Sequence, residues 1–364
     1  MNLRAFLGRN PFARRRAPVD SSAYAEAVCA LIPRWSYVPL SEEGGEPLVP
    51  CVERGQRVAE GQRLAGAAGC AAPVHSPVPG IVEDFVPCRT PDGQTREAVK
   101  IRLGGAFSYL GRPLEKDDWR ARSEAELRET LADKGVVNTF AAPAPLAAQA
   151  ASLRNEPSRI LAVRLYDDDP SRCVESFVTR TRFAEIAEGA EILAKASGAK
   201  RIAFLFSEEV GFEPEKNLSA EWHIAARFFP VPAQRCPSGG KREIVQAVRV
   251  AAGDSPFAAL CSSDLFVDGI TLCNAYRAAA FGIPVMETVV QVSGSALKSG
   301  GMFSVRIGTL ARELAAECGG FAKEPAGIAV NGLATGWSVS APDTPVTKCV
   351  KSVRFMRKAE LPDR

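Results

Sequence analysis

The chain has 364 residues, of which 46% are hydrophobic and 24% are charged, and its formal net charge is +3. This length suffices for two or three domains, and the nearly balanced charge gives no support for nucleic-acid binding. No apolar run approaches the roughly 18 residues that a membrane-spanning helix requires. We therefore expect a globular protein in the cytoplasm.

The N-terminal segment, residues 1–35, is basic and has two possible interpretations. Its arginines at positions 14–16 follow an interrupted apolar stretch that does not resemble a secretory signal. The segment can be a solvated tail, as chain termini often are. Alternatively, the arginines can contact an anionic membrane surface, with Phe6 and Phe12 as shallow anchors. The sequence leaves both interpretations open.

The ten cysteines and two histidines do not form a metal-binding pattern. No two cysteines have C-x-x-C spacing, and His75 and His223 lie far apart. Structural zinc and iron–sulfur sites usually need clustered ligands. We therefore predict no metal site, and reduced, mostly buried cysteines.

Residues 36–112 are rich in Val, Pro and Gly, with short apolar runs between turn signals, which indicates many short strands. Two similar halves cover residues 46–66 and 73–88. This pattern resembles the barrel-sandwich hybrid shared with biotinyl and lipoyl carrier domains. Such carriers present a modified lysine between the halves, but residues 65–72 contain no lysine. A carrier function is therefore not expected.

Strands and helices alternate over residues 113–284, which predicts an α/β domain with a largely parallel sheet. The predicted helices cover residues 123–133, 181–197, 241–250 and 271–281, and the predicted strands cover residues 159–165, 202–206 and 265–267.

Residues 285–340 have the size and pattern of a small β-grasp domain. The predicted strands cover residues 286–293, 304–307 and 328–331, with a helix at 309–318. The final residues, 341–364, are basic and show no strong periodicity.

Several motifs follow one another in a specific order along the chain. They are PLSEEGG (39–45), APVHSPVPGIV (72–82), GAKRI (198–202), CPSGGKREIVQAV (236–248), VVQVSGSAL (289–297), IGTLARELAAECGG (307–320) and NGLATG (331–336). Together they resemble the RnfC family of the Rnf ion-translocating electron-transport complex and, more distantly, the NADH-oxidising flavoprotein of respiratory complex I. The resemblance implies a barrel-sandwich hybrid, a Rossmann-like α/β domain and a β-grasp domain of the SLBB type.

The resemblance also implies an FMN-binding glycine loop at residues 135–146, which this chain has changed. Asn138, Phe140, Ala141 and Pro143 stand where the family has glycines. Glycine offers free amide donors and positive φ without steric cost, whereas proline removes a donor and fixes φ. We therefore predict that the FMN site is lost.

The family continues into a ferredoxin module, for which residues 341–364 look like a remnant. The four cluster-ligand positions are Val346, Cys349, Ser352 and Met356. Because a four-iron cluster needs four ligands, a single thiolate cannot hold one. We therefore predict no iron–sulfur cluster.

Two functions from different classes remain. The first is a structural or assembly subunit without a cofactor or catalytic residues. It would lie at the cytoplasmic face of the inner membrane, with other subunits of an electron-transport complex as partners. The second is an active electron-transfer component, of the NADH or ferredoxin oxidoreductase kind, that binds FMN or NADH in an altered mode. We favour the first, because missing donors and ligands are not restored by the fold.

The second function would depend on residues beside the altered loop. Its candidate cofactor-binding residues are Asp167, Asp169, Ser238, Gly239, Gly240 and Lys241. Lys241 follows two glycines and could contact a phosphate, although a solvated lysine at a helix start is the simpler interpretation. A small ligand of the β-grasp domain is a third possibility, for which no residue gives a specific indication.

Overall fold

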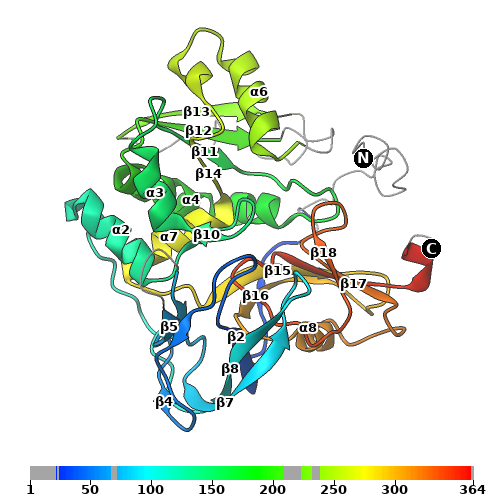
Figure 1. The fold of residues 1–364 in the computed structure, drawn as a ribbon. Helices are drawn as coiled ribbons and strands as arrows, with labels where there is room; N and C mark the ends of the chain where they lie inside the picture. Colours follow the sequence, from blue (N-terminus) through cyan, green and yellow to red (C-terminus); the bar gives the residue numbers. More distant parts are fainter. Residues whose placement is uncertain (1–21, 23, 67–71, 208–222, 232–237, 362–364) are drawn as a thin grey trace.

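The computed structural model describes residues 22, 24–66, 72–207, 223–231 and 238–361 (Figure 1). Most of the basic N-terminal segment and positions 67–71 between the two predicted halves therefore lie outside the described residues. Among the described helices, none combines the length and apolarity that a membrane span requires.

The first domain consists of short strands in two antiparallel sheets, as the turn-rich sequence predicts. One sheet has the order β2-β8-β7-β4 and the other β3-β5-β6. The strands are β2 (Trp35–Pro39), β3 (Val49–Pro50), β4 (Arg57–Val58), β5 (Arg63–Gly66), β6 (Val74–His75), β7 (Gly80–Arg89) and β8 (Thr95–Leu103).

The middle of the chain forms a four-stranded parallel sheet in the order β13-β12-β11-β14, which confirms the predicted parallel α/β arrangement. Its strands are β11 (Ile160–Arg164), β12 (Arg201–Phe206), β13 (Ala225–Pro230) and β14 (Leu265–Asp268). The helices are α2 (Glu124–Asp133), α3 (Leu146–Leu153), α4 (Val174–Ser197), α6 (Lys241–Ala252) and α7 (Gly269–Phe281).

Helices cover both faces of this sheet (Figure 1). Alternate residues of a strand point to opposite faces. Accordingly, Leu161 and Val163 of β11 join the core formed with α4 and α7. Ile160 and Ala162 join the second core, beneath α6. The sheet is therefore buried on both sides, which explains its nearly continuous apolar strands.

Helix α4 differs from its predicted extent. Its end at Gly198, which has a left-handed conformation, agrees with the prediction, but it begins at Val174 and not at residue 181. Residues 174–179 are buried on every side, so this stretch has no polar face and no helical periodicity. A break at Arg182, where φ is −132°, separates it from the amphipathic part.

The C-terminal sheet has six strands in the order β1-β16-β15-β19-β17-β18. Its elements are β1 (Val28–Cys29), β15 (Glu287–Ser293), β16 (Gly301–Arg306), α8 (Ala311–Glu317), β17 (Gly327–Val330), β18 (Trp337–Val339) and β19 (Ser352–Met356). Strand β19 lies parallel to β15 and antiparallel to β17. The sheet therefore extends beyond the predicted limits of 285–340, because strands from both flanking segments complete it.

The position of β19 predicts that the C-terminal sheet depends on it. Phe355 is fully buried and packs edge-on against Phe321. The substitution Phe355→Ala should lower the free energy of unfolding by about 3–5 kcal/mol, as expected for a large buried aromatic residue. Urea denaturation measures this loss. The exposed Lys358→Ala variant should remain within about 0.5 kcal/mol of the wild type, and an equally small loss in Phe355→Ala would contradict the assignment.

Candidate functional site

The candidate site lies where β11 and β14 end side by side. Arg164 and Asp268, the last residues of these strands, are partners in the parallel register. In α/β proteins, ligands usually bind at the carboxyl ends of parallel strands. Two further segments meet at this edge: the loop at residues 137–145 and the turn at 238–240.

Arg164 connects these two segments. Its side chain is 1% exposed. Nη1 donates to the Gly239 carbonyl at 2.8 Å, and Nη2 donates to the Phe140 carbonyl at 3.1 Å. The guanidinium also stacks over the Phe140 ring, 4.3 Å from its centroid. Arg164 and Phe140 thus fill the space between the loop and the turn.

The altered loop is held by its own side chains. It is a short hairpin, β9 (Val137–Asn138) and β10 (Ala144–Pro145). The Phe140 amide donates to Asn138 Oδ1 at 3.0 Å, and the Thr139 amide donates to Thr271 Oγ1 at 2.9 Å. Both amides are therefore committed within the protein, and proline has no amide hydrogen to offer. A phosphate cradle needs several such donors directed at one point.

A buried ion cluster lies directly below the loop. Lys351 Nζ is 2.5 Å from Asp268 Oδ2 and 2.7 Å from Glu175 Oε1. Asp268 also accepts hydrogen bonds from the Thr271 amide and hydroxyl, at 2.9 and 2.6 Å. Thr139 Oγ1 donates to the same carboxylate at 2.9 Å. Charges buried this deeply are tolerated only when they are paired and hydrogen-bonded.

The two carboxyl groups of this cluster titrate differently. Burial would raise the pKa of Asp268, but the charge of Lys351 and then that of Arg164 outweigh it, so its pKa falls to about 2. Burial and the neighbouring Asp268 charge raise the pKa of Glu175 to about 7, against the opposing effect of Lys351. One lysine therefore serves two acids, and Asp268 is the one that stays ionised.

The predicted residues Asp167 and Asp169 both lie at this edge, and each has a structural partner. Asp167 Oδ2 accepts hydrogen bonds from the Ser176 amide and hydroxyl, at 3.0 and 2.9 Å, so it caps the start of α4. Asp169 Oδ2 accepts from the amides of Ala334 and Thr335, at 2.7 and 2.8 Å. It therefore anchors the loop of the C-terminal sheet that contains NGLATG.

A glycine is needed where Asp169 meets that loop. Gly332 has a φ of +109°, and a Cβ atom there would lie 2.3 Å from the Asp169 carboxylate. Any side chain would therefore separate the two segments. Between Asp167 and Asp169, Asp168 pairs with Arg164 and Arg172. Burial opposes ionisation of Asp168, but these two arginines outweigh it and hold its pKa well below the usual range.

The predicted turn, residues 238–241, presents carbonyl groups to this site. Tyr166 Oη donates to the Ser238 carbonyl at 2.8 Å. A Cβ atom on Gly239 would lie 2.1 Å from Asp168 Cβ, so this turn packs tightly on the loop that follows β11. Gly240 is the N-cap residue of α6.

Lys241 begins α6 and is held at the edge of a small pocket. Its Nζ donates to the Ser262 carbonyl at 3.3 Å and lies 5.1 Å from the Phe266 ring centroid. The pocket that Lys241 shares with Asn138 and Phe140 has a volume of about 150 Å³. Small-molecule sites usually measure about 300–1,000 Å³.

The structure thus brings the two predicted groups of residues together, and their role as cofactor ligands stays a prediction. The sequence interpretation missed the residues that organise the site, above all Lys351 and Glu175. Lys351 lies in a segment without periodicity, 83 residues from its partner Asp268. An arginine at the end of an apolar strand, as at Arg164, was the one available signal.

Comparisons with known proteins agree with this arrangement. The family model for the RnfC barrel-sandwich hybrid domain matches residues 20–106. The RnfC protein of the ion-translocating oxidoreductase complex of Rhodobacter capsulatus is 26% identical over 335 residues, which cover 90% of this chain and 63% of that protein. The chain is RnfC-like.

A second relative extends the similarity. The corresponding protein of the proton-translocating ferredoxin:NAD(+) oxidoreductase complex of Clostridium ljungdahlii is 24% identical over 361 residues, covering 95% of this chain and 76% of that protein. The match of the RnfC-like chain therefore spans 63% of the length of the first relative and 76% of the length of the second.

A solved structure shows the same fold. An NAD+-reducing [NiFe]-hydrogenase in the air-oxidized state matches with a TM-score of 0.54 and 13% identity, over 69% of this chain and 50% of that chain. This likeness concerns the fold alone.

The buried ion cluster leads to a prediction about stability. The substitution Lys351→Met leaves Asp268 and Glu175 without their shared cation. It should lower the free energy of unfolding by about 3–5 kcal/mol, the usual cost of an uncompensated buried charge. Chemical denaturation measures the change, with the exposed Lys298→Met as control. A loss below about 1 kcal/mol would show that the cluster does not stabilise the fold.

The raised pKa of Glu175 predicts a pH dependence. Between pH 4.5, its ordinary value, and about 7, the folded state keeps the proton that the unfolded state has released. Glu175 should therefore lower stability as pH rises through this range, by up to about 1.4 kcal/mol per pH unit. The variant Glu175→Gln should remove this slope in denaturation curves recorded from pH 5 to 7. The exposed Glu129→Gln should keep it.

Proposed function

We propose that this RnfC-like chain is a component of an Rnf-type electron-transport complex that serves as a structural or assembly subunit without FMN or iron–sulfur clusters. The two relatives belong to ion-translocating and proton-translocating oxidoreductase complexes, which supports the assignment to such a complex. Other subunits of that complex, at the cytoplasmic face of the membrane, would be its partners.

The observation that carries this proposal is the filled space beside the altered loop. Arg164 and Phe140 occupy it and bond to each other and to the turn at Gly239. The two loop amides that face inward are used by Asn138 and Thr271. These residues do not fit an FMN phosphate, which needs open backbone donors.

The segment that aligns with the ferredoxin entry supports the same proposal. Ser352 and Met356 are the first and last residues of β19, and Val346 is 1% exposed in the core of the C-terminal sheet. Cys349 is the single thiol among the four aligned ligand positions. These residues do not fit a four-iron cluster, which needs four ligands.

What the chain keeps is architecture. We propose that the parallel sheet is a Rossmann-like domain that lacks its cofactor, and that the C-terminal sheet is a β-grasp domain of the SLBB type. Asp169 and Lys351 join these parts through hydrogen bonds and an ion pair. A rigid body of this kind offers fixed surfaces to neighbouring subunits, which is what an assembly subunit requires.

Purification tests the loss of cofactors. The full chain, isolated without oxygen, should be colourless, and calorimetric titration should detect no binding of FMN or NADH at concentrations up to about 100 μM. A bound yellow flavin, or FMN affinity in the micromolar range, would contradict the proposal. It would support instead an active electron-transfer component with an altered binding mode.

Complementation tests the structural role. A host strain that lacks this chain should lose assembly of its membrane complex, and the wild-type chain should restore it. The variant Lys241→Ala should restore assembly equally well, because Lys241 contacts a phosphate only in the altered binding mode. Normal assembly with impaired electron transfer in Lys241→Ala would favour the active component.

A further inference from the structure

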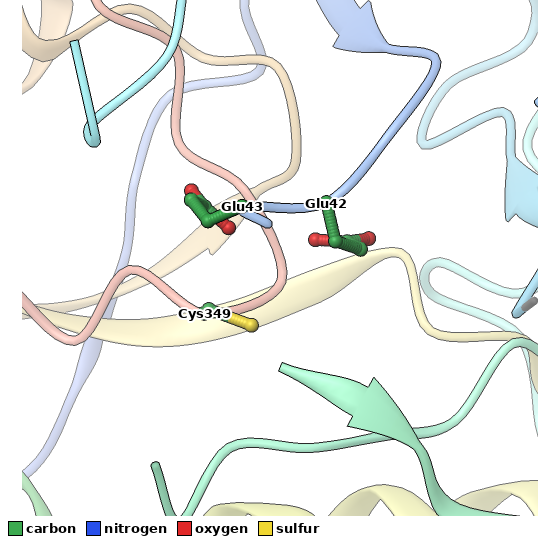
Figure 2. Close-up of side chains that lie close together, drawn as sticks. All are labelled: Glu42, Glu43 and Cys349. Carbon is green, nitrogen blue, oxygen red and sulfur yellow. The ribbon is translucent and has the colours of Figure 1, made fainter. Parts of the chain in front are cut away.

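A second group of buried polar side chains lies outside the candidate site. Glu42, Glu43 and Cys349 approach one another between the loop that follows β2 and the segment that precedes β19 (Figure 2). One carboxylate oxygen of each glutamate and the cysteine Sγ all lie within 4.8 Å of one another. The cluster therefore joins two segments that are distant in sequence.

The carboxylate oxygens of this cluster are only half satisfied. Thr347 Oγ1 donates to Glu43 Oε1 at 2.8 Å, and Lys348 Nζ lies 3.5 Å from Glu42 Oε1. The Oε2 atoms of both glutamates are buried and make no hydrogen bond with any part of the chain that the structure describes. Glu43 is 4% exposed, so water does not compensate readily. An unsatisfied buried carboxylate oxygen often marks an ion site.

The charges around the cluster do not balance without a further cation. Lys348 offsets one of the three negative charges that two carboxylates and a thiolate carry. Its Nζ is already shared with the carbonyls of Pro73 and Gly135, at 2.8 and 3.0 Å. Burial and the charge of Glu42 raise the pKa of Glu43 to about 7. Burial also raises the pKa of the Cys349 thiol well above its usual value. A divalent cation would supply the two missing positive charges.

The backbone holds these donors in place. Asn331 Nδ2 donates to the Cys349 carbonyl at 2.8 Å. Val346 exchanges backbone hydrogen bonds of 2.8 Å with Gly308 and Thr309. Donor atoms around one tetrahedral Zn²⁺ lie about 3.3–3.8 Å apart, given bond lengths of about 2.0–2.3 Å. The present spacing reaches that range after side-chain movements of roughly 1 Å.

We propose that Glu42, Glu43 and Cys349 form a mononuclear Zn²⁺ site that ties the loop after β2 to the segment before β19. A thiolate with two carboxylates suits Zn²⁺, whereas Mg²⁺ and Ca²⁺ prefer oxygen ligands alone. Three protein ligands leave one tetrahedral position for water. The site is distinct from a four-thiolate iron–sulfur cluster, because two of its three donors come from the first domain. It also replaces the expectation of no metal, which considered only ligands close in sequence.

Cobalt titration of the full-length protein tests this site. The protein is purified with a non-thiol reductant, stripped with a chelator and titrated with Co²⁺, which gives a near-ultraviolet charge-transfer band only when a thiolate is bound. We expect a band that saturates at one equivalent and is displaced by Zn²⁺. Cys349→Ser should abolish the band and weaken Zn²⁺ binding by roughly 100-fold or more, and Glu43→Gln should weaken it at least tenfold.

Matched controls keep the proposal open to refutation. Cys318→Ser removes another buried thiol, at the end of α8, and should leave the titration unchanged. If Cys349→Ser does not fold, the wild-type band and the Glu43→Gln affinity decide the matter. Absence of a band in the wild type would overturn the proposal, leaving a neutral Glu43 and a Glu42–Lys348 pair. An equal loss in Cys318→Ser would overturn it as well.

Discussion

The pairing of Lys351 with Asp268 and Glu175 is the constraint on which the centre of this molecule depends. Three ionisable groups are removed from water there, and the lysine comes from a different part of the chain than the two acids. Such a cluster contributes little when intact but costs several kcal/mol when one member is lost. It therefore fixes the position of the C-terminal segment against the parallel sheet more than it adds to stability.

The same segment contacts both of the preceding domains. Lys348 reaches Pro73 in the first domain and Gly135 at the start of the altered loop, while Lys351 reaches the end of β14. On the sequence, these lysines belong to a stretch that looks like the remnant of a cluster-binding module. In the structure they are buried cations that hold domains together, which is consistent with a chain that has exchanged cofactor ligands for internal contacts.

Much of the fold could be predicted, because local signals agree with it. Ser123 and Glu126 form the predicted capping box of α2, and Gly198 ends α4. The apolar runs that became β11, β12 and β14 are long enough to be recognised alone. The start of α4 was missed because a helix buried all around has no polar face, and β1 and β19 were missed because short strands are determined by their neighbours. The ion cluster could not be predicted at all, since its members meet only after the sheets have packed.

The order of strands in the C-terminal sheet also bears on how the protein is made. Strand β19 lies between β15 and β17, although it is synthesised after both of them. During translation, β15 and β17 therefore remain without their common neighbour until residues 352–356 have left the ribosome. Long-range pairings of this kind slow folding and leave strand edges exposed in the meantime. The nascent chain thus passes through a stage in which it is open to misassembly, and a holding chaperone would act at that stage.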